Sequence, residues 1–176
     1  MMSLVGWRVD GKLPNLPKFV LIGAPHTSNW DFVLFLGLIF SLRANVRFMG
    51  KAELFRPPHG FFFRYCGGVP VDRKKSSGLV EQMVKASNES EKFILTIAPE
   101  GTRHHVVEWK HGFYHIAKKA EIPIVMAVVD GKNKTVRVGQ VFHPTEDMEA
   151  DMKTIKLFFE GIVGINPRRK YITLKS

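Results

Sequence analysis

The sequence predicts an α/β fold, a single layered domain whose mostly parallel central sheet is flanked by helices. Apolar strand-like runs alternate along the chain with helix-like runs, which is the pattern of such layered domains. The chain has 176 residues, of which 45% are hydrophobic, and this is enough for one substantial core. We find no internal repeat and no low-complexity segment. We therefore expect one domain over 1–176, with a basic tail at 166–176.

The expected elements follow in a regular order. A buried strand over 19–24 leads into an apolar helix over 30–43. The other expected strands are 46–49, 69–71, 93–98, 122–129 and 135–142, and the other expected helices are 76–90, 110–120 and 145–161. We expect Ser76 or Ser77 and Thr145 to cap two of these helices. The carboxyl ends of parallel strands share one edge, so the polar loops that follow 24, 71 and 98 are expected to converge there.

The loop after the first strand carries His26 and Asp31. On a continuous helix an offset of five residues separates two side chains by about 140°. If they meet, His26 lies in the turn and Asp31 in the first helical turn, reaching back. Two interpretations follow from the residues alone. Asp31 either only caps the helix together with Ser28, or caps the helix while orienting His26 as a general base.

The two other loops supply guanidinium groups. Arg73 follows the strand over 69–71, and the segment Glu100, Gly101, Thr102 and Arg103 follows the strand over 93–98. Guanidinium forks bind phosphate or carboxylate groups bidentately and remain charged. No serine or cysteine has the flanking glycines of a nucleophile elbow. The attacking hydroxyl is therefore expected to belong to a substrate, and a phosphorylated alcohol attacking an activated acyl group fits these loops.

Composition limits the cellular setting and the partners. The single cysteine, Cys66, excludes an internal disulfide and suits a reducing compartment. The N-terminal residues 1–11 do not read as a signal peptide, and the longest apolar run, 32–40, is too short to span a bilayer. The formal net charge of +10 indicates polyanionic partners such as nucleic acid, phosphorylated substrates or anionic membrane surfaces.

Four blocks of residues, in order, resemble a known family. They are His26 and Asp31 with four residues between them, then 67–73 (Gly-Gly-Val-Pro-Val-Asp-Arg), 99–103 (Pro-Glu-Gly-Thr-Arg) and 122–125 (Ile-Pro-Ile-Val). This arrangement is similar to that of the glycerolipid acyltransferases, the glycerol-3-phosphate and lysophosphatidate (1-acylglycerol-3-phosphate) acyltransferase family. The resemblance covers 26–129, includes the segment Lys51-Ala52-Glu53-Leu54, and points to the short members without transmembrane helices.

The resemblance implies an O-acyltransferase of phospholipid biosynthesis. It would move a fatty acyl group from acyl-CoA or acyl-carrier protein to a hydroxyl of a lysophospholipid or a glycerol-phosphate-type acceptor. His26 would be the base and Asp31 its partner, while the acceptor would be held by Arg73, Glu100, Gly101, Thr102 and Arg103. Because a carboxylate repels phosphate, we expect Glu100 to accept hydrogen bonds from a hydroxyl or to brace Arg103.

The implied partners are the acyl donor, the lipid acceptor and an anionic membrane contacted peripherally, and nucleic acid is not among them. The implied location is the cytoplasm, at the inner face of the cell membrane. No cofactor and no metal are expected. The chain departs from the family pattern at Ala98, where an aromatic residue is frequent, and at Pro70, His104 and Met126. These departures leave the identity of the acceptor open.

Other functions remain open on the residues alone. His104, His105, His111 and His115 could serve a metal-dependent hydrolase. The basic residues could belong to a non-enzymatic module that binds nucleic acid or an anionic membrane. The aromatic run Phe61-Phe62-Phe63 fits either core packing or docking on a membrane.

Overall fold

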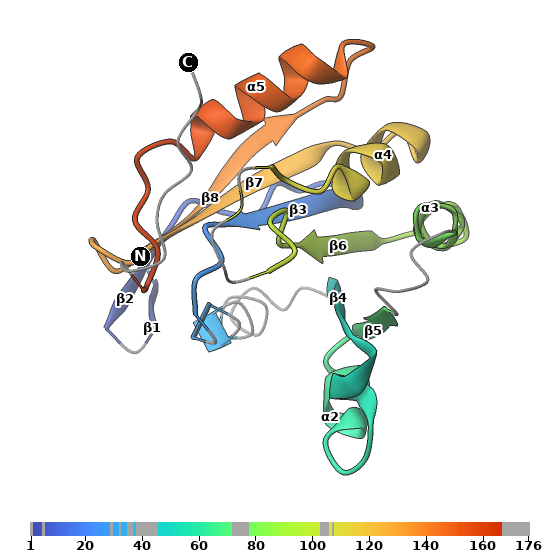
Figure 1. The fold of residues 1–176 in the computed structure, drawn as a ribbon, viewed down its shortest axis with the longest axis horizontal. Coiled ribbons are helices and arrows are strands. Elements are labelled where there is room, and N and C mark those ends of the chain that lie inside the picture. The colour runs from blue at the N-terminus through green and yellow to red at the C-terminus, as the bar shows by residue number, and fades with distance from the viewer. Residues whose placement is uncertain are drawn as a thin grey trace.

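The computed structural model of the chain describes residues 2–4, 6–28, 30–31, 33–34, 37, 46–71, 78–102, 106 and 108–166. Within these residues, eight strands form one sheet in the order β1-β2-β8-β7-β3-β6-β4-β5 (Figure 1). The strands are β1 (Met2–Leu4), β2 (Trp7–Asp10), β3 (Lys18–Ala24), β4 (Val46–Lys51), β5 (Gly68–Val71), β6 (Phe93–Ile97), β7 (Ile124–Asp130) and β8 (Thr135–Phe142). The helical elements are the 3₁₀ turn η1 (Ala52–Phe55) and the α-helices α2 (Gly60–Tyr65), α3 (Leu79–Asn88), α4 (Gly112–Lys119) and α5 (Met148–Phe158).

The prediction of a mostly parallel sheet is confirmed by the central strands. Strands β7, β3, β6, β4 and β5 run parallel to one another, and β8 joins β7 in antiparallel register. Strands β1 and β2 extend the sheet beyond β8 and were not predicted. The reason is that β2 alternates half-buried and exposed residues over only four positions, which is too short a pattern to recognise in the sequence.

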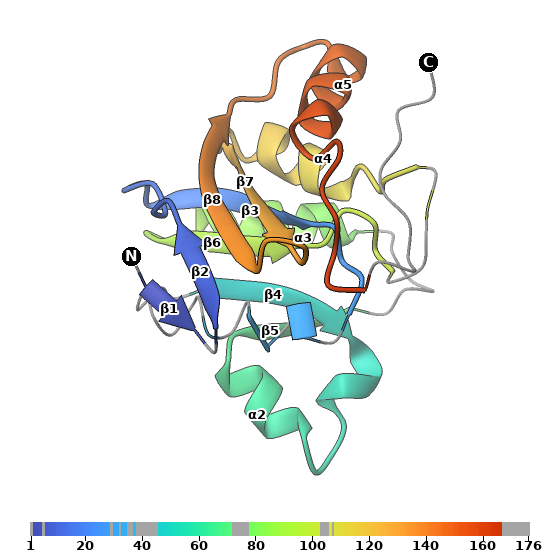
Figure 2. The same cartoon turned by 90° about the vertical axis from the view of Figure 1, so that its left-hand side faces the viewer.

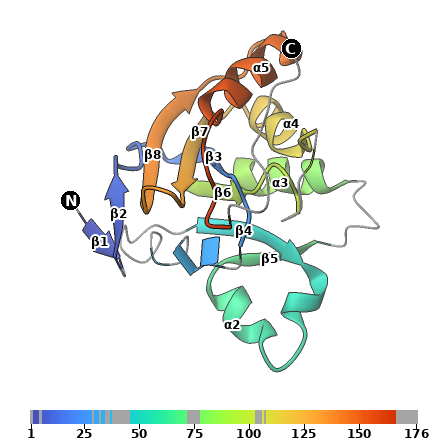
Figure 3. The ribbon, with the colours of Figure 1, turned by 60° about the vertical axis from the view of Figure 1, so that its left-hand side comes forward.

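One face of the sheet is covered by helices α3, α4 and α5, which lie along the same side in Figure 3. Val20, Ile22 and Ala24 of β3 point to this face, because successive side chains of a strand alternate between its two sides. They pack with fully buried helical residues such as Tyr114 and Ile155. This larger cluster holds the central strands in place beneath the helices.

The opposite face of the sheet carries a smaller apolar cluster. Phe19 and Leu21 of β3 point to this side, together with Val125 and Val136. Leu34, from the segment after His26, packs against the same cluster. The described residues of that segment, 30, 31, 33, 34 and 37, are helical, and the rest of the predicted helix lies outside the described residues.

Two predicted helix caps differ from the structure. Helix α5 begins after Asp147, whose side chain accepts a hydrogen bond from the Ala150 N–H, so the prediction of Thr145 as its cap is wrong. Thr145 donates from its hydroxyl to the buried Asp151 carboxylate instead. Gly78, with φ of 85°, stands at the start of α3, and the predicted caps Ser76 and Ser77 lie outside the described residues.

Residues 52–65 project from the sheet between β4 and β5, and we call this segment the aromatic lobe (Figure 1). It contains η1 and the short helix α2, which the sequence did not predict because six residues are too few to show a helical period. Across the described part of the chain, no helix has the length and apolar character required to cross a membrane.

Candidate functional site

The loop after β3 brings His26 and Asp31 together. Nδ1 of His26 lies 3.1 Å from Oδ2 of Asp31, whose side chain is buried while that of His26 is 24% exposed. Asp31 reaches back from the first helical turn, which is the geometry expected from the spacing. A carboxylate beside Nδ1 favours the tautomer that carries its proton there, and Nε2 is then available to take a proton from another group.

The same carboxylate organises the backbone of the loop. Oδ2 of Asp31 accepts hydrogen bonds from the N–H groups of Thr27 and Ser28, both at 2.7 Å. The Ser28 hydroxyl in turn accepts from the N–H of Trp30 at 3.2 Å. Asp31 therefore caps the helix and contacts His26 through one oxygen, which provides both contacts of the second interpretation.

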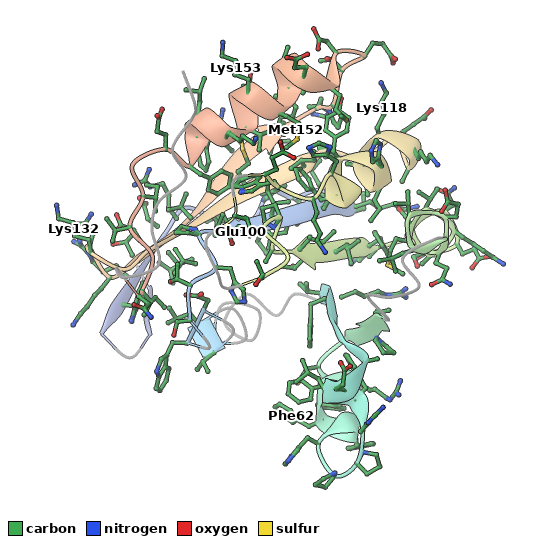
Figure 4. All side chains as sticks on the ribbon, in the orientation of Figure 1. Phe62, Glu100, Lys118, Lys132, Met152 and Lys153 are labelled. Atoms are coloured by element: carbon green, nitrogen blue, oxygen red, sulfur yellow. The ribbon has the colours of Figure 1, made fainter. Side chains whose placement is uncertain are left out.

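Glu100 reaches the same loop from the neighbouring strand. Strand β6 pairs with β3, and Oε2 of Glu100, in the turn after β6, accepts a hydrogen bond from the backbone N–H of His26 at 2.7 Å. Figure 4 labels Glu100 beside the end of β6. Burial raises the pKa of Glu100 to about 7, and the hydrogen bond from His26 only partly opposes this shift. The structure thus gives Glu100 a contact with the His26 loop that was not predicted.

Of the remaining predicted site residues, the structure describes Gly101 and Thr102. Gly101 and Thr102 follow Glu100 in the same turn, where Gly101 has φ of 65°, a conformation that favours glycine. An added Cβ at Gly101 would lie 3.0 Å from the Lys110 side chain. Arg73 and Arg103 lie outside the described residues. The structure therefore joins His26, Asp31 and Glu100 in one site, followed directly in the chain by Gly101 and Thr102.

A cavity of about 160 Å³ opens beside His26 on the face of the sheet opposite helices α3, α4 and α5. Its lining is mostly apolar, and it is formed by Leu21, Gly23, Pro25, His26, Asp31, Leu34, Phe48, Thr96, Ile97, Ala98, Ala127, Val129 and Val136. Two buried oxygens of this lining, Asp31 Oδ1 and Thr96 Oγ1, have no hydrogen-bond partner among the described residues. The site is therefore an apolar cavity with polar groups, including an imidazole, at a few positions.

The segment 162–166, which we call the C-terminal strap, packs on the His26 loop. After α5 the chain returns toward the loop that follows β3 (Figure 2), and the Asn166 N–H donates to the Thr27 hydroxyl at 3.1 Å. An added Cβ at Gly164 would lie 2.5 Å from two side-chain atoms of the buried Thr27. The Gly131 N–H donates to the Val163 carbonyl at 2.7 Å. No sequence motif marks this contact, and only the distant glycine Gly164 could have hinted at close packing.

The histidines considered for a metal site are only partly described. His111 and His115 are exposed at the start of α4, and His104 and His105 lie outside the described residues. Over the ranges that the structure describes, no group of three or more His, Cys, Asp or Glu side chains is placed to hold a metal ion.

Comparison with known proteins decides the family. Residues 8–130 match the model of the family described as Acyltransferase, which is more than half of the chain. The chain belongs to the acyltransferase family. The resemblance seen in the four sequence blocks is thereby confirmed, and the matched range contains His26, Asp31 and the turn at Glu100.

Two curated relatives of this acyltransferase chain are named 1-acyl-sn-glycerol-3-phosphate acyltransferase. The protein from Streptococcus pneumoniae is 28% identical over 142 residues, which cover 74% of this chain and 52% of the relative. The protein from Saccharomyces cerevisiae is 31% identical over 131 residues, which cover 69% of this chain and 42% of the relative. The chain thus spans about half the length of the curated relatives that it matches.

A solved structure shares the fold of this acyltransferase chain. The crystal structure of the 1-acyl-sn-glycerophosphate acyltransferase PlsC from Thermotoga maritima superposes with a TM-score of 0.63 at 21% identity. The superposition covers 86% of this chain and 68% of that one. The predicted α/β fold class is therefore confirmed.

The raised pKa of Glu100 predicts a pH-dependent effect of Glu100→Gln on stability. In the unfolded chain this carboxyl group loses its proton near pH 4.5, whereas in the folded chain it does so near pH 7. The unfolded state therefore binds fewer protons between these values, and the contribution of Glu100 to stability falls as the pH rises through this window. The glutamine side chain of the variant does not titrate, and its amide oxygen can still accept from the His26 N–H. We expect the free energy of unfolding of the variant to rise relative to wild type by up to about 3 kcal/mol between pH 4.5 and 7, and to level off above pH 7.

Urea unfolding at a series of pH values measures this difference. The exposed Glu108→Gln is the matched control and is expected to follow wild type. A difference between Glu100→Gln and wild type that stays constant across the window would contradict the assignment.

The close contact between the C-terminal strap and the loop predicts that Gly164→Ala disturbs the site. The new methyl group would overlap the buried Thr27 side chain, and overpacking of this kind costs about 1–3 kcal/mol. We expect this loss in the free energy of unfolding, together with shifted NMR signals of the His26 imidazole. The control is Gly112→Ala, where an added Cβ meets nothing within 4 Å. Unchanged His26 signals in Gly164→Ala would show that the strap does not support the loop.

Proposed function

We propose that this chain transfers a fatty acyl group from a thioester donor to a hydroxyl group of a glycerolipid acceptor. The observation that carries the proposal is the partly exposed His26, with Nδ1 beside the buried Asp31, at the wall of an apolar cavity. The arrangement provides a base with one oriented nitrogen next to a space suited to a hydrocarbon chain. Membership in the acyltransferase family supports the same chemistry.

In the proposed step, Nε2 of His26 takes the proton from the acceptor hydroxyl as its oxygen attacks the thioester carbonyl carbon. The carbon–oxygen bond forms, and the carbon–sulfur bond of the resulting tetrahedral intermediate then breaks. The departing thiolate receives the proton from the His26 imidazolium, which gives a free thiol and a new ester. Asp31 stabilises the imidazolium while it exists and holds the ring in place.

The cavity is proposed to hold the acyl chain. Its lining is mostly apolar, so a hydrocarbon chain would displace water from it favourably. Gly23 of β3 lines the cavity, and a Cβ added there would meet no atom within 4 Å. A residue without a side chain at this position therefore leaves space for a ligand.

The proposed acceptor is a 1-acylglycerol 3-phosphate, because both curated relatives are named for this substrate. Arg73, Gly101, Thr102 and Arg103 are proposed to hold its phosphate group, consistent with the formal net charge of +10. Glu100 is proposed to act in a different way, by positioning the backbone of the His26 loop through its hydrogen bond.

The donor is proposed to be acyl-CoA or acyl-carrier protein, and both are thioesters that require no cofactor or metal in the proposed step. Because the acceptor is an amphiphilic lipid, we propose that the chain works at the cytoplasmic surface of an anionic membrane. The excess of basic residues would favour such a surface.

Removing the base is expected to abolish most of the transfer. His26→Ala is expected to lower kcat by about 10²–10⁴-fold, because general base catalysis contributes a factor of this size. Asp31→Asn is expected to lower kcat as well, since the amide cannot stabilise an imidazolium. The measurement supplies each acyl donor in turn with 1-acylglycerol phosphate, glycerol 3-phosphate, a neutral lysolipid or no acceptor, and identifies the products by mass spectrometry.

The exposed His115→Ala serves as the matched control for loss of a histidine, and it should retain wild-type turnover. Circular dichroism checks that the variants are folded. Turnover by His26→Ala within tenfold of wild type would exclude His26 as the base. Release of free fatty acid in place of an ester product would show a hydrolase instead.

Filling the cavity is expected to change the preferred acyl chain. In Gly23→Leu the new side chain would occupy the space beside His26, so donors with short acyl chains should be preferred over long ones. The ratio of kcat/KM for short and long donors measures this preference. The same exchange at Gly112 is the control, because that glycine does not line the cavity. A chain-length profile identical to that of wild type would place the acyl chain elsewhere.

A further inference from the structure

The aromatic lobe, residues 52–65, has an internal core of its own. Phe55 is buried, its ring meets that of Phe63 edge to face with centroids 6.1 Å apart, and the guanidinium of Arg64 lies over it at 5.4 Å. An added Cβ at Gly60 would lie 2.0 Å from the Phe55 carbonyl oxygen, and one at Gly68 would lie 2.6 Å from the Phe55 ring. The lobe therefore packs tightly around one phenylalanine.

Other apolar side chains of the aromatic lobe point to solvent. Phe61 is 81% exposed and Tyr65 is 79% exposed, and both Phe62 and Leu54 are exposed as well. Phe61 and Tyr65 are four residues apart, which places them on one side of α2. Half of the exposed large hydrophobic side chains of the described residues belong to this segment of 14 positions. A cluster of this kind on a surface indicates a site of interaction.

The charges of the aromatic lobe select the partner. Arg56, His59 and Arg64 are exposed there, with Glu53 as the single acidic residue of the segment. Exposed aromatic rings with adjacent arginines fit the boundary of a lipid bilayer, where rings enter the acyl region and guanidinium groups bind phosphates. The formal net charge of +10 adds a long-range attraction to anionic lipids.

The position of the lobe relates it to the candidate site. η1 follows the carboxyl end of β4, which is parallel to β6 and, through β6, to β3, so the lobe begins at the edge where His26 and Glu100 lie. From there α2 leads back to the amino end of β5, the strand beside β4. In Figures 1 and 3 the lobe lies at the lower end of the molecule, and residues 30, 31, 33 and 34 lie above it, at about the height of β4. Two of those residues, Trp30 and Val33, are also exposed. Figure 4 labels Phe62 on the lobe.

We infer that the aromatic lobe docks on the surface of an anionic lipid bilayer through Phe61, Phe62 and Tyr65. Docking there places the β4–β5 side of the sheet against the membrane, where an amphiphilic acceptor resides. This inference rests on the proposed function for the identity of that acceptor. Vesicle binding itself is a separate property of the lobe and is measured without any reaction.

The test compares Phe61→Ser/Tyr65→Ser with wild type in co-flotation with vesicles of phosphatidylcholine alone or mixed with phosphatidylglycerol. Both side chains are largely exposed, so the double variant is expected to keep the fold, which thermal unfolding checks. We expect binding to the anionic vesicles to fall about tenfold or more, because two rings lose their apolar burial. Leu157→Ser, at an exposed apolar position on α5, is the matched control and should bind as wild type does.

A separate variant tests the contribution of the basic side chains of the lobe to membrane binding. Arg56→Gln is expected to weaken binding to the anionic vesicles and to reduce its dependence on salt, because one lipid phosphate contact is lost. Equal binding of Phe61→Ser/Tyr65→Ser and wild type would overturn the inference. Equal losses of vesicle binding in the double variant and in Leu157→Ser would also overturn it. A change from dimer to monomer in the double variant, with unchanged vesicle binding, would instead make the lobe a contact between two copies of the chain.

The kinetic comparison separates this inference from the proposed function. With a short-chain acceptor that stays monomeric in solution, the lobe variant should turn over as wild type does, whereas with the acceptor embedded in anionic vesicles its apparent KM should rise. If wild type binds vesicles through the lobe but makes no ester from any donor, the docking inference holds and the proposed function fails. If wild type makes ester and the lobe variant has the same vesicle binding and the same apparent KM with the embedded acceptor, the docking inference fails and the proposed function holds.

Discussion

The buried carboxylate of Asp31 is the interaction on which the rest of the site depends. Its Oδ2 accepts from two backbone N–H groups and faces His26, so one atom holds both the shape of the loop and the orientation of the imidazole. Burying a carboxylate is costly unless hydrogen bonds compensate it, and bonds to an ionised acceptor are the stronger kind. Because Oδ1 has no partner among the described residues, all the described compensation comes from the loop itself. Loop geometry and carboxylate burial therefore stabilise each other.

Glu100 fixes the backbone of His26, whose ring faces Asp31, by accepting a hydrogen bond from the His26 N–H. Two buried carboxyl groups around one histidine would repel each other if both were always ionised. Burial raises the pKa of Glu100 to about 7, so near neutral pH this group is uncharged for a substantial part of the time, and its oxygen can accept a hydrogen bond in either state. The two carboxyl groups differ in their task, since one faces the ring and the other fixes the main chain.

The sequence predicted those parts of the fold that local patterns encode. The apolar runs of β3, β6 and β7 identify buried parallel strands, and the spacing of His26 and Asp31 allowed the two side chains to meet only if Asp31 reaches back from a first helical turn. The hydrogen bond of Glu100 was missed because an acidic residue in a turn does not specify which backbone N–H it meets. Contacts between distant segments, such as that of Gly164 with Thr27, leave no periodic signal, and the six residues of α2 are too few to show a helical period.

The hydrogen bond between Asn166 and Thr27 joins residues 139 positions apart. The entropy cost of closing a loop increases only slowly with its length, so a separation of this size does not prevent the contact. The contact cannot form, however, before both Thr27 and Asn166 have been synthesised. During synthesis Thr27 is made 139 residues before Asn166. The loop therefore gains its contact with Asn166 only after strands β4 to β8, which lie between the two residues in the chain, have been synthesised.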